Sequence, residues 1–226
     1  IQSAKVREVQ RYGRAAARGP NSRSDVSRMA GEGARQLLTT LDSVTVSPAG
    51  STLFFEAVEA AYNEAVQHRH ATDHYYRLAD CTLRLSFAGN ALESILTPAL
   101  AHIECDRVEV PDLTILCWDD ASTGVSTPEP PTAPGHVGMD FVDEFVRIAW
   151  EPARRSLLLL DSTRTRGLMR FADAGSAAIW EPAAPCLRML HWWAAGRGMQ
   201  LVHAAAVGFS DGGVMLVGRG GSGKST

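Results

Sequence analysis

The stretch GVMLVGRGGSGKST, residues 213–226, joins a short apolar run to a glycine-rich loop that ends in lysine, serine and threonine. The apolar residues 214–217 have the length and composition of a buried strand. Glycines let the following backbone turn so that successive N–H groups point inward, and such a nest of amides binds anions. A strand followed by this loop predicts a phosphate-binding site in a fold that mixes helices and strands.

Residues 218–225 fit the pattern GxxxxGK[ST] at every fixed position. We expect Lys224 to reach the outer phosphates of a nucleotide as a point charge, and the Ser225 hydroxyl to ligate Mg²⁺. A following helix would add its N-terminal dipole. The pattern alone does not distinguish a kinase, an ATPase and a GTPase. The predicted nucleotide-binding residues are Gly218, Arg219, Gly220, Gly221, Ser222, Gly223, Lys224, Ser225 and Thr226.

The composition is that of a globular protein without an obvious nucleic-acid or membrane partner. The chain has 226 residues, 45% of them hydrophobic, and a net charge of -3. No apolar run approaches the ~20 residues that span a bilayer. We expect reduced cysteines in a cytoplasmic protein, because the four are far apart and form no CxxC. We also expect that the ends of the chain are trimmed, because the first residue is Ile1 and not methionine.

Periodicity predicts a helix over 53–66, then a region of consecutive antiparallel strands, then a second helix and a hairpin. The proline-rich residues 121–135 are expected to form a loop. The second helix is expected over 185–195, with Gly196 and Gly198 at its end. The predicted strands cover 76–87, 107–110, 113–118, 145–150, 156–161, 167–171 and 177–180, with the hairpin over 201–209 and 212–218.

Residues 201–226 resemble the catalytic domain of HPr kinase/phosphorylase, a bacterial protein-serine kinase related in fold to PEP carboxykinase. In that family a strand with a histidine runs through a hairpin into the strand before the phosphate-binding loop, and His203 stands at that place. Thr226 departs from the family, which often has an acidic or another residue after GKS. By contrast, transporter ATPases of the ABC type carry the loop near the start of their domain, whereas 217 residues precede it here.

More specifically, the chain is similar to the HPr-kinase-related proteins of peptide natural-product gene clusters, including those of lasso peptides. The stretches 76–92 and 111–122 carry this similarity. Some of these proteins phosphorylate a serine of a precursor peptide. The resemblance therefore implies an ATP- and Mg²⁺-dependent serine kinase whose substrate is a peptide or protein, and whose relatives commonly form homo-oligomers.

The resemblance also implies an organisation in three parts. We expect a basic, flexible or helical segment over 1–50 and a strand-rich recognition region over 51–180. Residues 181–226 would then begin a P-loop kinase domain with a PEP-carboxykinase-like core, cut off at the first nucleotide-binding helix. The fold class is expected to be α+β to α/β.

The expected catalytic residues are His203 and Lys224. His203 is a candidate for orienting the acceptor or the γ-phosphate, and its neutral imidazole can accept a proton. A buried strand histidine with a satisfied hydrogen bond is the competing interpretation. The family's acidic base and second metal ligand lie downstream of Thr226, so we expect the 226-residue chain by itself to be inactive. Another P-loop ATPase and a non-catalytic nucleotide-binding regulator are the alternatives.

Several further groups have both a functional and a structural interpretation. His70 and His74 of HRHATDH, four residues apart, would share a helix face and suggest a metal site with Asp73, but an exposed polar helix end is favoured. Asp119 and Asp120 suggest a metal-binding pair, but a turn cap is favoured. One of the two adjacent tryptophans is expected in the core and the other half covered. Two arginines of a hairpin-like loop suggest an anion grip, with a solvated turn as the default. The tryptophans are Trp192 and Trp193, and the arginines are Arg164 and Arg166.

Overall fold

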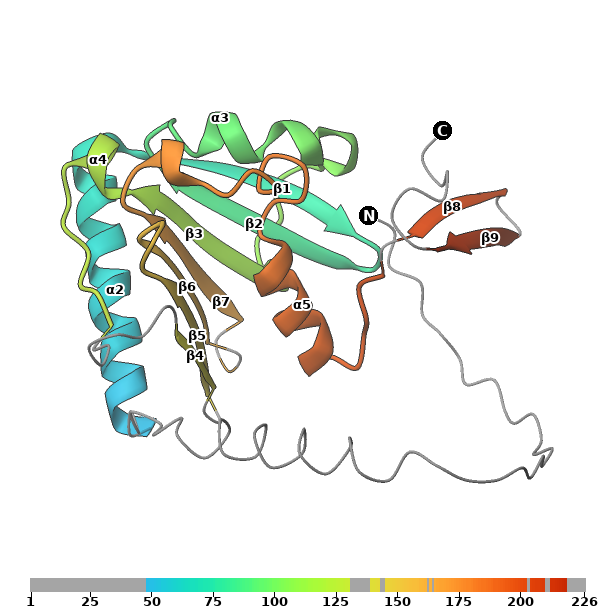
Figure 1. Ribbon diagram of the computed structural model, residues 1–226. Helices are drawn as coiled ribbons and strands as arrows, with labels where there is room; N and C mark the ends of the chain where they lie inside the picture. The colour runs from blue at the N-terminus through green and yellow to red at the C-terminus, as the bar shows by residue number, and fades with distance from the viewer. Residues whose placement is uncertain are drawn as a thin grey trace, which may run out of the picture. The chain divides into compact units, whose positions relative to one another are not determined.

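The computed structural model describes residues 48–130, 139–142, 145–161, 163, 165–202, 204–209 and 212–218. In these residues a seven-stranded mixed sheet carries helices, and a two-stranded sheet is formed near the end of the chain (Figure 1). The predicted α+β class is therefore confirmed. Almost all of the predicted basic segment 1–50 lies outside the described residues.

Helix α2, Pro48–Arg69, confirms and extends the helix predicted over 53–66. Its apolar residues recur every three or four positions, which gathers them on one face. The helix ends where His70 adopts a left-handed conformation with φ of 58°, and the His70 amide donates to the Val66 carbonyl at 2.8 Å. Such an ending is common at helix C-termini. The buried residues of this face are Phe55, Val58, Ala61, Tyr62 and Ala65.

Strands β1, Ala71–Leu78, and β2, Cys81–Ala88, form an antiparallel hairpin in which Leu78 pairs with Cys81. The prediction of one strand over 76–87 was wrong, because the chain reverses at Ala79 and Asp80. Ala79 takes a left-handed φ of 53° there. Neither turn residue is a glycine, an asparagine or a proline, so the usual sequence signal of a hairpin was missing.

The large sheet has the strand order β1-β2-β3-β7-β6-β5-β4. Its last four strands form an antiparallel meander, which confirms the predicted strands over 145–150, 156–161 and 167–171 and adds β4, which was not predicted. Strand β3, Leu113–Asp119, instead runs parallel to both of its neighbours, β2 and β7, so the expectation of antiparallel pairing throughout was wrong at the centre. The meander comprises β4 Met139–Val142, β5 Val146–Glu151, β6 Ser156–Asp161 and β7 Arg166–Phe171.

The structure describes residues 107–110 and 177–180 but forms no strand there, so these two strand predictions were wrong. Val110, before Pro111, is 82% exposed, and Ile179 is 88% exposed. Residues 177–180 form turns instead, and the Glu181 amide donates to the Ala178 carbonyl at 2.9 Å. In both places a proline follows, and it lacks the N–H group that a further strand pairing needs.

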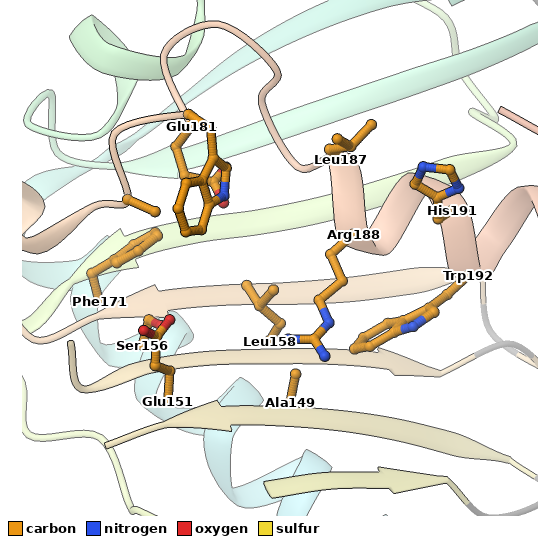
Figure 2. A pocket seen from close by; sticks show the side chains of 12 residues that line it. Ala149, Glu151, Ser156, Leu158, Phe171, Glu181, Leu187, Arg188, His191 and Trp192 are labelled. Carbon is orange, nitrogen blue, oxygen red and sulfur yellow. The ribbon is translucent and has the colours of Figure 1, made fainter. Parts of the chain in front are cut away.

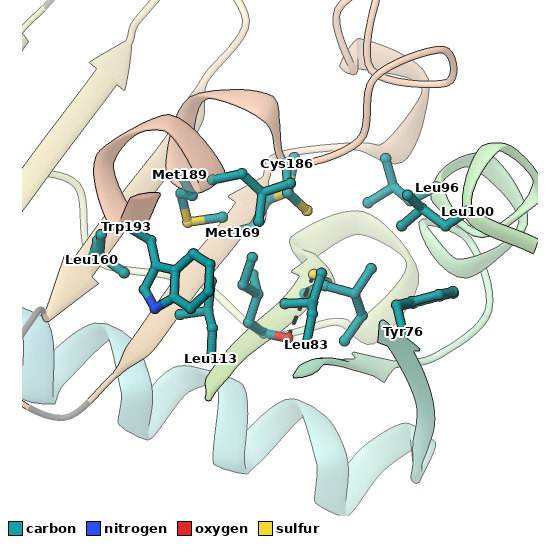
Figure 3. Packing of buried hydrophobic residues seen from close by; sticks show 14 of the residues in the cluster. Tyr76, Leu83, Leu96, Leu100, Leu113, Leu160, Met169, Cys186, Met189 and Trp193 are labelled. Atoms are coloured by element: carbon teal, nitrogen blue, oxygen red, sulfur yellow. Dashed lines mark hydrogen bonds between the residues drawn. The ribbon is translucent and has the colours of Figure 1, made fainter. Parts of the chain in front are cut away.

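Both faces of the sheet are covered by helices, and strand β3 contributes to both layers (Figure 1). Helix α2 covers one face over Leu116 and Trp118. The other face packs against helix α5, Leu187–Gly196, which confirms the helix predicted over 185–195 (Figure 3). The remaining short helices are α3 Glu93–Leu96, η1 Pro98–Ile103, α4 Asp120–Thr123 and η2 Ala174–Ser176.

Strands β8, Ala204–Phe209, and β9, Gly212–Val217, form the predicted hairpin. Gly208 lies opposite Gly213, and the two backbones approach closely there. A Cβ atom at Gly208 would lie 2.7 Å from the Gly212 carbonyl oxygen, so this position needs glycine.

Within the described ranges, no helix combines the length and the apolar character that a bilayer crossing requires. The longest, α2, has 22 residues but carries glutamates along its length and His68 and Arg69 in its last turn.

A buried ion pair joins the end of β3 to β7. Arg170 is 1% exposed, and its Nε donates to Asp120 Oδ1 at 3.0 Å. Its Nη1 donates to the Arg155 carbonyl at 2.9 Å, and its Nη2 contacts the second oxygen of Asp120. The Thr127 hydroxyl donates to Asp120 at 2.7 Å. A buried guanidinium with this many partners is costly to leave unpaired.

We expect Asp120→Ala to lower the free energy of unfolding by about 3–5 kcal/mol, because Arg170 would stay buried without its counter-charge. The control is Glu129→Ala, which removes the partner of the exposed Arg155. It should cost less than about 1 kcal/mol. Urea unfolding followed by circular dichroism measures both, and equal small losses would contradict the importance of the buried pair.

Candidate functional site

Only Gly218 of the predicted nucleotide-binding loop lies within the described residues, where it follows β9 directly. This order of strand and loop is the local arrangement that the motif requires. The other predicted positions, and the candidate catalytic His203, lie outside the described residues. The phosphate and metal contacts therefore stay predictions. The positions outside are Arg219, Gly220, Gly221, Ser222, Gly223, Lys224, Ser225 and Thr226.

The hairpin that leads to this loop exposes apolar side chains. In the described part of the chain, β8 and β9 pair with each other and with no third strand. An apolar surface of this kind is unusual on an isolated hairpin and typical of a strand pair that continues into a larger sheet. The exposed side chains are Val207, Val214, Met215, Leu216 and Val217.

Asp119 and Asp120 do not form a metal-binding pair, which confirms the favoured cap. Asp119 is the N-cap of α4, and its carboxylate accepts from the Ser122 amide at 2.8 Å and the Ser122 hydroxyl at 2.6 Å. Asp120 turns to Arg170 instead. Asp residues at N-caps satisfy the free amides of the first helical turn.

The three histidines of HRHATDH do not share a helix face. His68 lies on α2, His70 follows its end, and His74 lies on β1. The expectation of an exposed helix end holds for the first of these but not for His74, since the helix ends at Arg69. No group of three metal-binding side chains occurs among the residues that the structure describes.

His74 is held between two carboxylates from different elements. Its Nε2 lies 2.8 Å from Glu93 Oε1 on α3, and its Nδ1 lies 3.2 Å from Glu104 Oε1. Burial favours the neutral ring, but the hydrogen bonds to Glu93 and Glu104, helped by their charges, outweigh it and raise the pKa of His74. The ring also stacks on Tyr76. The protonated imidazole thus ties β1 to the segment that follows β2.

The described cysteines are all free thiols, as expected of a reduced protein. Cys117 and Cys186 are buried, whereas Cys81 and Cys105 are half-buried. The pKa of the Cys186 thiol is raised by its hydrogen bond with the neighbouring Cys117 and by the burial of Cys186 itself. The Cys186 Sγ lies 3.5 Å from the Met169 Sδ, so this thiol is part of the core between α5 and the sheet (Figure 3).

A pocket of about 300 Å³ lies between α5 and the meander strands (Figure 2). Its floor comes from β5, β6 and β7, and Figure 2 shows Phe171 and Glu181 on one side and His191 and Trp192 on the other, with Leu158 between them. The full lining is Ala149, Glu151, Ser156, Leu158, Phe171, Ala178, Trp180, Glu181, Leu187, Arg188, His191 and Trp192. A mainly apolar hollow with a few polar groups is the usual form of a ligand site.

The adjacent tryptophans of α5 behave as predicted. Trp193 is buried in the core, and Trp192 is half-buried at the pocket. Of the two arginines suggested as an anion grip, Arg166 forms an ion pair with Glu59 of α2, and Arg164 lies outside the described residues.

Sequence reasoning missed the pocket residues Trp180 and Glu181. Both belong to a turn, where Trp180 was predicted as the last residue of a strand and Glu181 lay just beyond it. The sequence IWEPAAP, residues 179–185, offered one signal, since an aromatic and an acidic residue precede two prolines there. Only the fold brings this turn over the meander.

Comparison with known proteins gives no assignment: no family model, no curated protein and no solved structure matches this chain.

We expect the stability that His74 contributes to be present in full below its unfolded pKa of about 6.5 and to be lost as the pH rises through its raised pKa in the folded state. The difference in unfolding free energy between the wild type and His74→Gln should therefore be largest near pH 6 and shrink toward pH 9. Urea unfolding across this range measures it. The exposed His102 of η1 supplies the control His102→Gln. A difference in unfolding free energy that is constant with pH would exclude a stabilising interaction of protonated His74 with Glu93 and Glu104.

Proposed function

We propose that the protein is an ATP-dependent serine kinase of the HPr-kinase type, which phosphorylates a peptide or protein. The observation that carries the proposal is the complete GxxxxGK[ST] loop directly after a strand, β9, that forms a hairpin with β8. The same order of hairpin, strand and loop is what the resemblance implies for the start of a PEP-carboxykinase-like core.

The donors in the loop suit a nucleotide triphosphate with Mg²⁺. Backbone amides at the glycines and the ammonium group of Lys224 are donors to phosphate oxygens, and the Ser225 hydroxyl is an oxygen ligand of the kind that Mg²⁺ prefers. ATP, when bound, supplies the γ-phosphoryl group. Lys224 would bind its outer phosphates, and Ser225 would hold the metal in place.

The transfer itself needs an aligned acceptor. The serine Oγ of the substrate forms a bond to the γ-phosphorus, the bond from that phosphorus to the β,γ-bridging oxygen breaks, and the serine proton passes to a base. We assign to His203 the orientation of the acceptor or of the γ-phosphate, or the acceptance of this proton. A precursor peptide of a ribosomal natural product is the substrate that the resemblance favours.

The seven-stranded sheet is proposed as the part that recognises the acceptor. It holds the pocket between α5 and the meander, on the face of the sheet opposite α2. A recognition role accounts for a large folded region ahead of the nucleotide loop, since phosphate binding needs only the loop and the elements around it.

The test incubates the complete gene product with ATP, Mg²⁺ and the small peptide encoded beside its gene, and measures the peptide mass. We expect one phosphate to be added to a serine. Lys224→Ala should reduce the rate at least about a hundredfold, because an interaction with the transferred phosphates is lost. The control is His102→Gln, at an exposed position of η1 outside the predicted nucleotide-binding residues, which should retain activity.

Other outcomes point to other functions. Consumption of ATP without a phosphopeptide would favour a P-loop ATPase that uses hydrolysis for conformational change. Nucleotide binding without turnover would favour a non-catalytic regulator. Absence of ATP binding would exclude a working phosphate-binding loop at 218–225.

A further inference from the structure

The charges around the pocket between α5 and the meander are paired except for one. Arg188 is held by Asp140, with both carboxylate oxygens 2.6 Å from its Nη2. Glu151 accepts from Arg154 Nε at 2.9 Å. Glu181, in contrast, accepts from a backbone amide and has no cationic partner within the part of the chain that the structure describes. One negative charge is therefore left over at the pocket.

Glu181 is also the most buried of these charged groups. It is 8% exposed, and its Oε2 accepts one hydrogen bond, from the Cys186 amide at 3.3 Å. Burial raises the pKa of this carboxyl group, and the hydrogen bond from Cys186 only partly opposes that. A carboxylate has room for further donors, so a cation that enters the pocket would satisfy it.

The two tryptophans at the pocket already contact guanidinium groups, and one of these, that of Arg188, itself lines the pocket (Figure 2). The Arg154 guanidinium carbon lies 5.3 Å from the ring centre of Trp180, and that of Arg188 lies 5.5 Å from the ring centre of Trp192. Indole faces attract cations, and a planar guanidinium also stacks on them. The two tryptophans are thus surfaces of the kind that a further guanidinium prefers.

We propose that this pocket binds an arginine side chain of a peptide partner, with the guanidinium at Glu181 and the aliphatic stem over Leu158 and Phe171. The volume of about 300 Å³ is at the lower end of the range for ligand sites and suits a single long side chain. The identity of the partner as the phosphate-accepting peptide rests on the proposed function, whereas the binding of arginine does not.

An acidic ligand is the main competitor, because Arg188 and His191 also line the pocket. Arg188, however, is already neutralised by Asp140. An anion would also come close to Glu151 and Glu181, and the repulsion from the unpaired Glu181 would oppose it. The charge balance of the pocket therefore favours a cation.

The test titrates the 226-residue chain with the peptide acetyl-Gly-Gly-Arg-Gly-Gly-amide and follows its tryptophan fluorescence, with ligand-detected NMR as a second readout. The same peptide with citrulline in place of arginine has the same shape without the charge. We expect the arginine peptide to bind at least about tenfold more tightly, the size of one charge-assisted hydrogen bond. Peptides with lysine or glutamate at this position complete the set.

Glu181→Gln is the decisive variant, since glutamine keeps the size and can still accept from the Cys186 amide. It should lower the affinity for the arginine peptide about tenfold, to the level of the citrulline peptide. Glu151→Gln is the matched control at the same pocket, and it should change the affinity less than about twofold because Arg154 already pairs with this carboxylate. Trp180→Ala, at a half-exposed position, should weaken binding several-fold.

Equal binding of the arginine and citrulline peptides, or an unchanged affinity in Glu181→Gln, would overturn the proposal. Tighter binding of the glutamate peptide would assign the pocket to an acidic group, and equal binding of the lysine peptide would remove the assignment to arginine. No binding at millimolar peptide would also overturn it. Neither ATP nor Lys224 takes part in this measurement, so its failure is distinct from a failure of the kinase proposal.

Discussion

The structure depends on the central strand β3, which is buried on both faces. Ile115 and Cys117 pack toward α5, while Leu116 and Trp118 pack toward α2. A strand of this kind needs an apolar residue at almost every position and a cover on each side. Both covers and both neighbouring strands are supplied by segments far apart in the sequence, so β3 is the element on which the two layers meet.

At the C-terminal end of β3, two aspartates connect the strand to its neighbours. Asp119 caps α4, and Asp120 pairs with the buried Arg170 of β7. The polar residues of this stretch thus lie where the chain leaves the sheet, and they satisfy backbone amides and a guanidinium that would otherwise be buried without partners. The pocket beside α5 lies over the meander strands that this arrangement holds in register with β3.

Local patterns predicted most of the elements but not their arrangement. The helices α2 and α5 and the strands β3 and β5 to β7 followed from periodicity, since their apolar residues are buried as the spacing requires. The strands β8 and β9 were also predicted, although their apolar side chains are exposed. The β1–β2 turn was not predicted, because Ala79 adopts a left-handed conformation that usually requires a glycine. Parallel pairing of β3 was not predictable from alternation alone, because alternation does not give strand direction. The candidate pocket could not be predicted either, since Glu181 and Trp192 come to line one pocket only through the packing of α5 and its preceding turn.

The position of β7 beside β3 has a consequence for how the chain reaches this state. Asp120 and Arg170 are fifty positions apart, and the strands β4, β5 and β6 lie between them in the sequence. During synthesis β3 leaves the ribosome long before β7, so one edge of this central strand stays unpaired while the four strands β4 to β7 are made. Long-range parallel pairing of this kind slows folding, because the loop between the partners must close first. The meander, whose strands pair with their neighbours in sequence, can form as a unit and then dock, which shortens the time for which β3 is open to the wrong partner.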